Sequence, residues 1–262
     1  MNPNPITQAL KEGRAVIGTM IVQARSPAFI QLFAEYGLDF VFIDMEHGPY
    51  TMEIAADLIQ VARLAGITPM VRVPEIGYQL YARLLDAGAQ GIMTPRVESA
   101  AQVREIVKYT KYPPVGQRGF SRLAGHVNYS EIDFGHFISH ANDNLPNIIQ
   151  IESKTAVDNL DEILSVPGID AIMVGPDDLA LSMGLVGNTR HRMIEEMLEH
   201  IFEICGAHHT PWGLHLPDAE RLTGWLQRGM KFATFSSDIW MMQQVLGQDL
   251  PRLRAILSET AS

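Results

Sequence analysis

The sequence is poor in cysteine, in lysine and in positive charge. Its 262 residues include one cysteine, which excludes a disulfide framework within the chain and predicts a reducing, cytoplasmic compartment. Lysine occurs only five times, and 30 acidic against 20 basic residues give a net charge of −10. A surface of this sign repels phosphate groups. We therefore expect neither nucleic acid nor an anionic membrane as a partner.

Long apolar runs and nucleotide-binding motifs are also absent. No run reaches the ~18 apolar residues of a membrane span, and Met1–Pro5 lacks the basic region and apolar core of a secretory leader. No G-x-G-x-x-G or phosphate-loop motif occurs. The chain is 47% hydrophobic and 19% charged, so it can bury a sizeable core. These features predict a cytoplasmic protein with a single domain over residues 1–262.

Short apolar runs alternate with helical patterns along the whole chain. Asn147–Ile151 and Ala171–Val174 are two such runs, and the helical pattern Lys154–Leu164 lies between them. A strand, a helix and a second strand in so few residues form a βαβ unit, whose strands are parallel neighbours. The predicted strands are Val16–Val22, Phe40–Asp44, Thr68–Val73, Gly91–Pro95, Asn147–Ile151, Ala171–Val174, Trp212–Leu216 and Phe232–Ser236.

Helical patterns fill the intervals between these strands. They include Pro27–Tyr36, Met52–Ala65, Gln79–Asp86, Ala100–Thr110, Arg190–His208 and Asp218–Arg228. Eight such βα units predict an α/β fold of the TIM (β/α)8 barrel type. A doubly wound open sheet is the alternative, but Gly175–Asp178 is not a dinucleotide-binding turn.

Two carboxylates follow the neighbouring strands of the βαβ unit. Glu152 comes directly after Asn147–Ile151, and Asp178 follows Ala171–Val174 within the turn Gly175–Leu179. The carboxyl ends of parallel strands meet at one edge, where barrel enzymes place their chemistry. Carboxylate oxygens are preferred ligands of hard divalent cations. We therefore predict that Glu152 and Asp178 hold one divalent metal ion.

A polar cluster ends the second strand. Phe40–Asp44 runs directly into Glu46 and His47. Histidine takes and gives protons near neutral pH, so His47 is a candidate acid or base that Asp44 or Glu46 would orient. The alternative is a histidine that caps the next helix or binds a backbone carbonyl.

Arg72 and Asp86 are further candidates near the third strand. Arg72 interrupts an apolar strand and needs an anion, either a ligand or a barrel carboxylate, because a buried unpaired guanidinium is very costly. Asp86 ends a helix, where its negative charge is unfavourable with the dipole. It either pairs with a group such as His47 across a subunit contact or is an ordinary surface aspartate.

Five motifs occur in a characteristic order. They are Phe42–Gly48, Val71–Val73, Leu85–Gly91, Gln150–Ala156, and Gly168–Asp170 running to Gly175–Ala180. This set resembles the HpcH/HpaI aldolase family, the class II pyruvate aldolases related to the citrate lyase β-subunit. The resemblance extends from about Gly13 to the Gly229–Ser237 strand. It implies a barrel of the phosphoenolpyruvate-utilising type, Mg²⁺, Mn²⁺ or Co²⁺ on Glu152 and Asp178, and a hexamer that exchanges C-terminal helices between subunits.

The resemblance also implies a lyase reaction on small molecules. The substrates would be 4-hydroxy-2-oxo acids, such as 4-hydroxy-2-oxoheptanedioate or 2-keto-3-deoxy sugar acids, cleaved reversibly to pyruvate and an aldehyde. Cleavage leaves a pyruvate enolate, whose charge the metal would stabilise as a Lewis acid. Arg72 would hydrogen-bond the enolate oxygen. His47, oriented by Asp44 or Asp86, is the expected base for the 4-hydroxyl, either directly or through a metal-bound water.

Two more contacts are expected at the pyruvate end. Gly175, Pro176 and Asp177 open a helix whose N–H groups would bind the pyruvate carboxylate. Gln150 would hold a carboxylate oxygen or a water on the metal.

The aldehyde end is expected to be shaped by looser elements. The prolines and glycines of Lys111–Asn128 predict a βα loop over the active-site face. The predicted contributors are Met20, Gln23, Arg25, this loop with Arg118 and Arg122, and Leu214–Leu216.

Three alternatives to a metal-dependent aldolase are less favourable. A CoA-ester lyase like the citrate lyase β-subunit needs a basic surface for the CoA phosphates, which a net charge of −10 disfavours. A non-catalytic barrel would not need Arg72, Glu152 and Asp178 together. A Schiff-base aldolase needs a lysine at the site, and only Lys154 lies near the right end of a strand. Lys154 begins a helix, so its side chain should point away.

Overall fold

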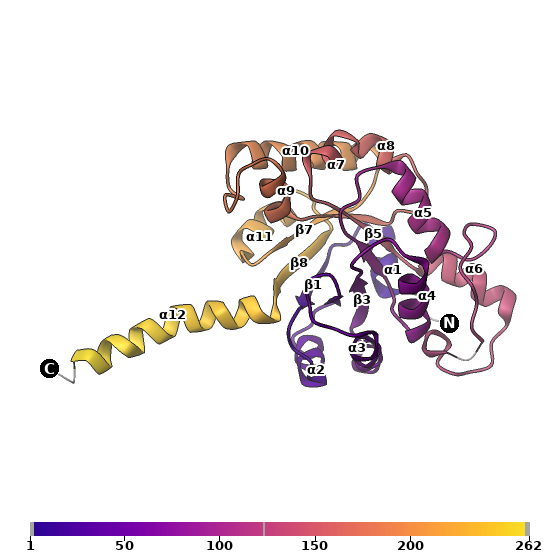
Figure 1. The fold of residues 1–262 in the computed structure, drawn as a ribbon, viewed down its shortest axis with the longest axis horizontal. Helices are drawn as coiled ribbons and strands as arrows, with labels where there is room; N and C mark the ends of the chain where they lie inside the picture. The colour runs from indigo at the N-terminus through magenta and orange to yellow at the C-terminus, as the bar shows by residue number, and fades with distance from the viewer. Residues whose placement is uncertain (1–2, 123, 260–262) are drawn as a thin grey trace.

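The computed structural model describes residues 3–122 and 124–259, which form a closed eight-stranded barrel surrounded by helices (Figure 1). The strands pair in chain order, all parallel, and β8 pairs with β1 to close the barrel. Met1, Asn2, Leu123 and residues 260–262 of the predicted single domain lie outside the described residues. The strands are β1 (Val16–Ile21), β2 (Phe40–Asp44), β3 (Thr68–Arg72), β4 (Ile92–Thr94), β5 (Asn147–Ile151), β6 (Ala171–Val174), β7 (Trp212–Leu216) and β8 (Phe232–Ser237).

The predicted TIM barrel is therefore confirmed, with each predicted strand in place. The helices are α1 (Pro5–Lys11), α2 (Pro27–Glu35), α3 (Met52–Ala65), α4 (Tyr78–Ala87), α5 (Ala100–Thr110), the 3-10 helix η1 (Gly125–Val127), α6 (Phe134–Asn144), α7 (Lys154–Asp158), α8 (Leu160–Leu164), α9 (Pro176–Ser182), α10 (Arg192–Ala207), α11 (Ala219–Gln227) and α12 (Asp238–Glu259).

Local sequence signals explain most helix boundaries. The Thr51 and Ser99 hydroxyls accept hydrogen bonds from the first turns of α3 and α5, as N-cap residues do. Gly66 ends α3 in the left-handed conformation that favours glycine. The predicted helix Lys154–Leu164 is instead two short helices, α7 and α8, which break at Asn159. The Asn159 side chain donates a hydrogen bond to the carbonyl of Glu98 at this break.

Side chains alternate along the strands and separate two apolar layers. Phe40, Phe42 and Phe232 pack inside the barrel, whereas Val41 and Ile43 pack outward against the helices. Ile6 and Ala9 of α1 join the inner cluster and close the amino-terminal end of the barrel. Polar side chains are therefore left to the carboxyl ends of the strands.

The described residues of the segment Lys111–Asn128 lie at the amino-terminal end of the barrel, so the prediction of a loop over the active-site face is wrong. It follows α5 rather than a strand, and barrel helices run back toward the amino ends of the strands. Arg118 and His126 line one pocket together with Asn4 and with Thr68, which begins β3.

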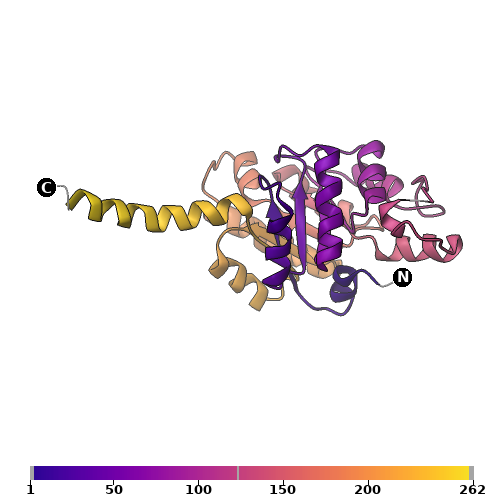
Figure 2. The same cartoon turned by 90° about the horizontal axis from the view of Figure 1, so that it is seen from below.

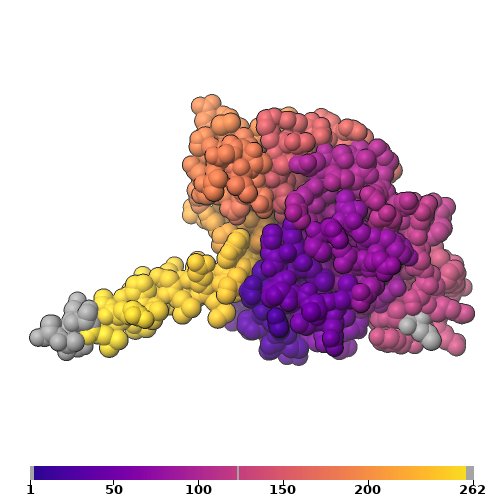
Figure 3. Space-filling model, viewed as in Figure 1, coloured from indigo at the N-terminus to yellow at the C-terminus, as the bar shows by residue number. Residues whose placement is uncertain are grey.

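Helix α12 extends away from the barrel (Figures 1 and 2). The space-filling view shows it as an arm that leaves the compact body (Figure 3). Its exposed apolar residues include Met242, Val245, Leu246, Leu250, Leu253, Ile256 and Leu257. The arm therefore presents an apolar surface that its own barrel does not cover.

No helix in residues 3–122 and 124–259 combines the length and apolar character that crossing a membrane requires.

Candidate active site

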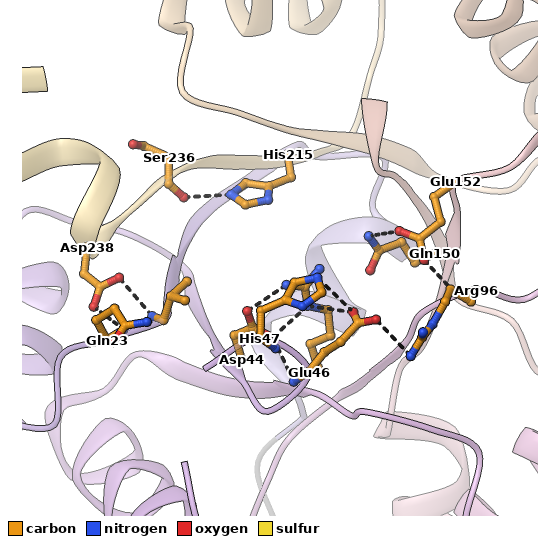
Figure 4. A network of polar contacts seen from close by, with 12 residues as sticks. Gln23, Asp44, Glu46, His47, Arg96, Gln150, Glu152, His215, Ser236 and Asp238 are labelled. Atoms are coloured by element: carbon orange, nitrogen blue, oxygen red, sulfur yellow. Dashed lines mark hydrogen bonds and ion pairs between the residues drawn. The ribbon is translucent and has the colours of Figure 1, made fainter. Parts of the chain in front are cut away.

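Polar residues from several strands gather at the carboxyl end of the barrel (Figure 4). Arg72 and Gln150 follow the interior residues Met70 and Ile148 by two positions, so they point inward by strand alternation. Asp44 follows the interior residue Phe42 in the same way. The barrel thus brings together residues that are far apart in the sequence.

Arg72 and Asp44 form a buried pair at the ends of adjacent strands. Arg72 Nε donates to Asp44 Oδ1 at 2.8 Å, and Nη2 donates to Oδ2 at 2.7 Å. Asp44 Oδ1 also accepts the backbone N–H groups of Glu46 and His47 at 3.1 and 3.3 Å. Asp44 therefore positions both the guanidinium and the loop after β2, but it does not contact the His47 ring.

Glu46 is the carboxylate that faces the His47 ring. Its Oε2 lies 3.9 Å from His47 Nε2 and 3.4 Å from Arg72 Nε, and its Oε1 lies 3.2 Å from Arg96 Nη2. Burial raises the pKa of Glu46, and the charge of Arg72 partly offsets this rise. The His47 side chain is 61% exposed, so its imidazole is accessible from the barrel mouth.

Glu152 is a buried carboxylate without a cationic side chain bound to it in the described residues. Its Oε1 accepts the backbone N–H of Arg96 at 2.8 Å, and its Oε2 accepts Gln150 Nε2 at 2.5 Å. Burial raises the pKa of Glu152 to about 7, and the nearby charges of Asp178 and Glu46 add to this rise. Arg96 has φ +54°, which is uncommon for a non-glycine residue and turns its N–H to this carboxylate.

Gly175 lies in close contact with the side chains of Glu152 and Gln150. A Cβ at this position would lie 2.9 Å from both Glu152 Oε2 and Gln150 Nε2. Gln150 Oε1 is buried and has no hydrogen-bond partner in the described part of the chain. A site with a buried carboxylate, an unused amide oxygen and a missing side chain suits a cation and its ligands.

The first turn of α9 differs in detail from the prediction. The Gly175 N–H donates to the carbonyl of Ile151 at 3.2 Å, and Pro176 has no N–H. Among the residues predicted to bind a carboxylate, only Asp177 therefore keeps an N–H for this purpose. Asp177 and Asp178 are both exposed. The described residues contain no group of three or more histidine, cysteine or acidic side chains arranged to hold a metal, so Glu152 and Asp178 would act as a pair.

Asp86 lies apart from these residues within the chain. Its Oδ1 accepts Arg118 Nη2 at 2.7 Å, and His126 Nδ1 lies 3.7 Å from the same oxygen. One chain therefore does not bring Asp86 to His47. Lys154 is also remote from the chemistry, because its Nζ pairs with Asp158 at 2.6 Å on the exposed side of α7.

His215 on β7 belongs to the site although it was not singled out from the sequence. Its Nε2 donates to the carbonyl of Ser236 at 3.0 Å, and its ring stacks on Trp240 with centroids 5.0 Å apart. Burial lowers the pKa of His215 to about 4, and the charge of Arg72 acts in the same direction. The alternation of Trp212, Leu214 and Leu216 with Gly213 and His215 is the signal that places His215 inside.

Asp238 fixes the loop that follows β1. Its two oxygens accept the backbone N–H groups of Val22, Gln23 and Ala24 at 2.9, 2.9 and 2.6 Å. Asp238 begins α12, so the arm and the rim of the site share one residue. Sequence patterns give no signal for this contact or for the left-handed conformation of Arg96.

Comparison with known proteins identifies the family. The model of the family described as HpcH/HpaI aldolase/citrate lyase matches residues 19–244. The chain is 35% identical to the 2-dehydro-3,6-dideoxy-6-sulfogluconate aldolase of Pseudomonas putida over 94% of this chain and 95% of that protein. It is 32% identical to the 2-keto-3-deoxy-L-rhamnonate aldolase of Escherichia coli K12, over 96% of this chain and 94% of that protein.

A solved structure supports the same assignment. The crystal structure of an HpcH/HpaI aldolase from Desulfitobacterium hafniense superposes with a TM-score of 0.92 at 31% identity, covering 97% of each chain. The resemblance noted in the sequence and the expectation of a carbon–carbon lyase are thus confirmed. The chain belongs to the HpcH/HpaI aldolase/citrate lyase family.

Proposed function

We propose that this chain is a divalent-metal-dependent aldolase that cleaves 4-hydroxy-2-oxo acids reversibly to pyruvate and an aldehyde. One observation carries the proposal: the buried carboxylate Glu152, beside Gly175, faces the same barrel mouth as the Arg72–Asp44 pair. An anion-binding and a cation-binding group at one mouth suit a substrate with a carboxylate and a 2-oxo group. The names of the relatives favour 2-keto-3-deoxy sugar acids within this class.

Glu152 and Asp178 would hold the metal, which is Mg²⁺, Mn²⁺ or Co²⁺. The fit rests on the geometry of Glu152, a buried carboxylate whose hydrogen bonds come from the Arg96 backbone and the Gln150 amide, and burial of this carboxyl raises its pKa. A bound cation supplies positive charge and polarises the 2-oxo group as a Lewis acid. Gln150 Oε1 would bind one of the remaining ligands, and Gly175 lets Glu152 and Gln150 approach the turn closely.

The pyruvate half would be fixed by Arg72 and by the start of α9. Asp44 binds Nε and Nη2 of Arg72, so Nη1 is left for the oxygen on which enolate charge develops. Because Asp44 holds the guanidinium in one orientation, no side-chain reorganisation is needed as the charge appears. The Asp177 N–H would bind the carboxylate, with Gly175 and Pro176 shaping the turn around it.

His47 is the proposed base. It takes the proton of the 4-hydroxyl, the bond between C3 and C4 breaks, the aldehyde leaves, and the enolate is then protonated at C3 to give pyruvate. Glu46 is placed 3.9 Å from the ring to stabilise the imidazolium. A role for Asp86 in orienting His47 would require contact between two copies of the chain.

Contact between copies of the chain is part of the proposal. The uncovered apolar residues of α12 favour a homo-oligomer, with a hexamer that exchanges this helix as the proposed form. We further propose that the enzyme acts in the cytoplasm on small molecules.

A substrate screen tests the proposed function. Pyruvate release would be measured across 4-hydroxy-2-oxo acids, before and after exhaustive chelation and with each metal restored. We expect release to depend on metal, with sugar-derived substrates among the best. Release of pyruvate at an undiminished rate after chelation would contradict the proposal.

A further inference from the structure

We propose that His215 determines specificity by accepting a hydrogen bond from a hydroxyl group on the aldehyde half of the substrate. The inference rests on the proposed aldolase function and assigns a role to a residue that the mechanism above leaves unused.

His215 lies inside the barrel mouth. Its strand neighbours Leu214 and Leu216 pack in the outer apolar layer, and His215 is opposite Thr234 in the register of β7 with β8. His215 is half-buried, so it keeps partial contact with solvent. The charges of Arg72 and Asp44 both act on it, so it shares their site.

The orientation of the imidazole is fixed from two sides. Ser236 supplies a carbonyl oxygen, which only accepts, so Nε2 of His215 must carry the hydrogen. Trp240 stacks on the ring at an interplanar angle of 20°. With Nε2 protonated and the pKa of His215 lowered to about 4 by burial, the ring is neutral and Nδ1 is an acceptor.

An irregularity in β8 creates this arrangement. Gly18 pairs with Thr234, but Met20 pairs with Ser237, so β8 contains an extra residue relative to β1. Ser236 sits in this bulge with φ +56°, a conformation that a serine rarely adopts. Its carbonyl thereby also accepts the Thr19 hydroxyl at 3.3 Å. Bulges of this kind re-aim groups next to active sites.

The free acceptor faces the site. Figure 4 shows the second ring nitrogen of His215 turned away from Ser236, toward the side of the mouth where Asp44 and His47 lie. No hydrogen bond reaches Nδ1 within residues 3–122 and 124–259. The Ser236 hydroxyl is buried and also has no partner among those residues. Nδ1 can therefore accept a hydrogen bond from a polar group of a ligand, and an apolar group placed against it would leave this acceptor unpaired.

The side of the barrel mouth formed by β7 and β8 is left for the aldehyde half of the substrate. Arg72 on β3, Glu152 after β5 and Gly175 after β6 account for the pyruvate half. His215 and Ser236 lie on β7 and β8, which continue the barrel from β6 to β1. An imidazole of such low pKa is a weak base, so hydroxyl recognition rather than proton abstraction is its role.

Two variants distinguish the effect of the Nδ1 acceptor from the effect of the aromatic ring. His215→Phe keeps an aromatic ring against Trp240 and removes Nδ1, whereas His215→Asn loses the ring and keeps an acceptor near the Nδ1 position. The measurement is kcat/KM for addition of pyruvate to lactaldehyde and to propanal, which differ by one hydroxyl. We expect His215→Phe to lower the lactaldehyde-to-propanal ratio about tenfold or more, and His215→Asn to restore most of it. An unchanged ratio in His215→Phe would overturn the inference.

Two further measurements distinguish failure of the proposed role of His215 from failure of the proposed aldolase function. Exchange of the pyruvate methyl hydrogens with deuterium needs only the pyruvate half, so wild type should show it without an added aldehyde. Absence of exchange in wild type would refute the aldolase proposal itself, whereas exchange with an unchanged ratio would refute only the role of His215. The pH profile of cleavage should keep its shape in His215→Phe, and loss of a limb would assign His215 as a base instead.

Discussion

Arg72 and Asp44 are joined by two parallel hydrogen bonds, from Nε to Oδ1 at 2.8 Å and from Nη2 to Oδ2 at 2.7 Å. Both side chains are almost fully buried. Because the same carboxylate holds the backbone of His47, the position of the proposed base depends on the pair that positions the guanidinium. Asp44 therefore positions both Arg72, which would bind the pyruvate half, and His47, the proposed base for the 4-hydroxyl.

Replacing Arg72 by lysine should therefore cost far more activity than its charge suggests. An ammonium cannot make both contacts with Asp44 and also present a donor to the enolate oxygen. We expect kcat to fall about 10²- to 10³-fold, the typical effect of losing one such donor. Steady-state kinetics of pyruvate release measures this, with the melting temperature as a control for folding. Turnover close to wild type would show that Arg72 has only a structural role.

Metal binding should depend on pH through Glu152. Its pKa of about 7 means that protons compete with the cation, so the affinity should fall about tenfold per pH unit below 7 and level off above it. Metal affinity rises with pH, whereas the free energy of unfolding of the metal-free protein falls with pH. Since the pKa rises from 4.5 in the unfolded chain to about 7, ionisation of Glu152 lowers the free energy of unfolding as pH rises through that window.

Titration with Mn²⁺ at pH 6, 7 and 8, followed by calorimetry and by thermal melting, measures both effects. Added metal should raise the melting temperature more at pH 8 than at pH 6. Glu152→Gln should remove the pH dependence together with tight binding. Equal affinity at all three pH values in wild type would remove Glu152 from the metal site.

Gly175→Ala tests the close packing of Glu152 against the turn before α9. The added Cβ would lie 2.9 Å from Glu152 Oε2, so either this carboxylate or the turn must move. We expect metal affinity to fall at least tenfold, while far-ultraviolet circular dichroism stays unchanged. Gly224→Ala is the matched control, because nothing lies within 4 Å of a Cβ there. Similar metal affinities in the two variants would mean that metal binding does not depend on the position of Glu152 against Gly175.

A Schiff base should not form on this protein. Lys154 pairs with Asp158 on the surface of α7, which confirms the expectation that its side chain points away from the site. Treatment with pyruvate and borohydride should leave the intact mass unchanged, because Lys154 is paired with Asp158 and does not reach the keto carbon. A stable adduct mapped to Lys154 would replace the metal mechanism with a covalent one.

The sequence was informative wherever a signal was local or periodic. Runs such as Phe40–Asp44 and Asn147–Ile151 gave the strands, and their order gave the barrel, so the shared edge of Glu152 and Arg72 followed from topology. Composition alone misplaces the segment Lys111–Asn128. Its prolines and glycines are typical of an active-site loop, but the segment follows a helix rather than a strand.

Other features have no local signal. The Asp238 contacts with Val22 and Gln23 depend on how β8 and β1 meet, and the bulge at Ser236 depends on their register. His215 was predictable from strand alternation, but the Ser236 carbonyl that fixes its tautomer was not. Long-range hydrogen bonds of this kind are decided by tertiary packing, which a single sequence does not encode locally.

The apolar arm α12 should hold subunits together. A single helix that leaves its own barrel gains little from propensity alone, so we expect burial against another copy to stabilise it. Replacing Leu250 and Leu253 by aspartate removes two exposed leucines, each of which contributes ~1.5–3 kcal/mol when fully buried. We expect the double variant to have a smaller molar mass by light scattering after gel filtration. Gln248→Asp adds a charge at an exposed polar position of the same helix and should keep the wild-type mass. A wild-type protein that is monomeric at micromolar concentration, or a double variant with unchanged mass, would show that α12 does not mediate assembly.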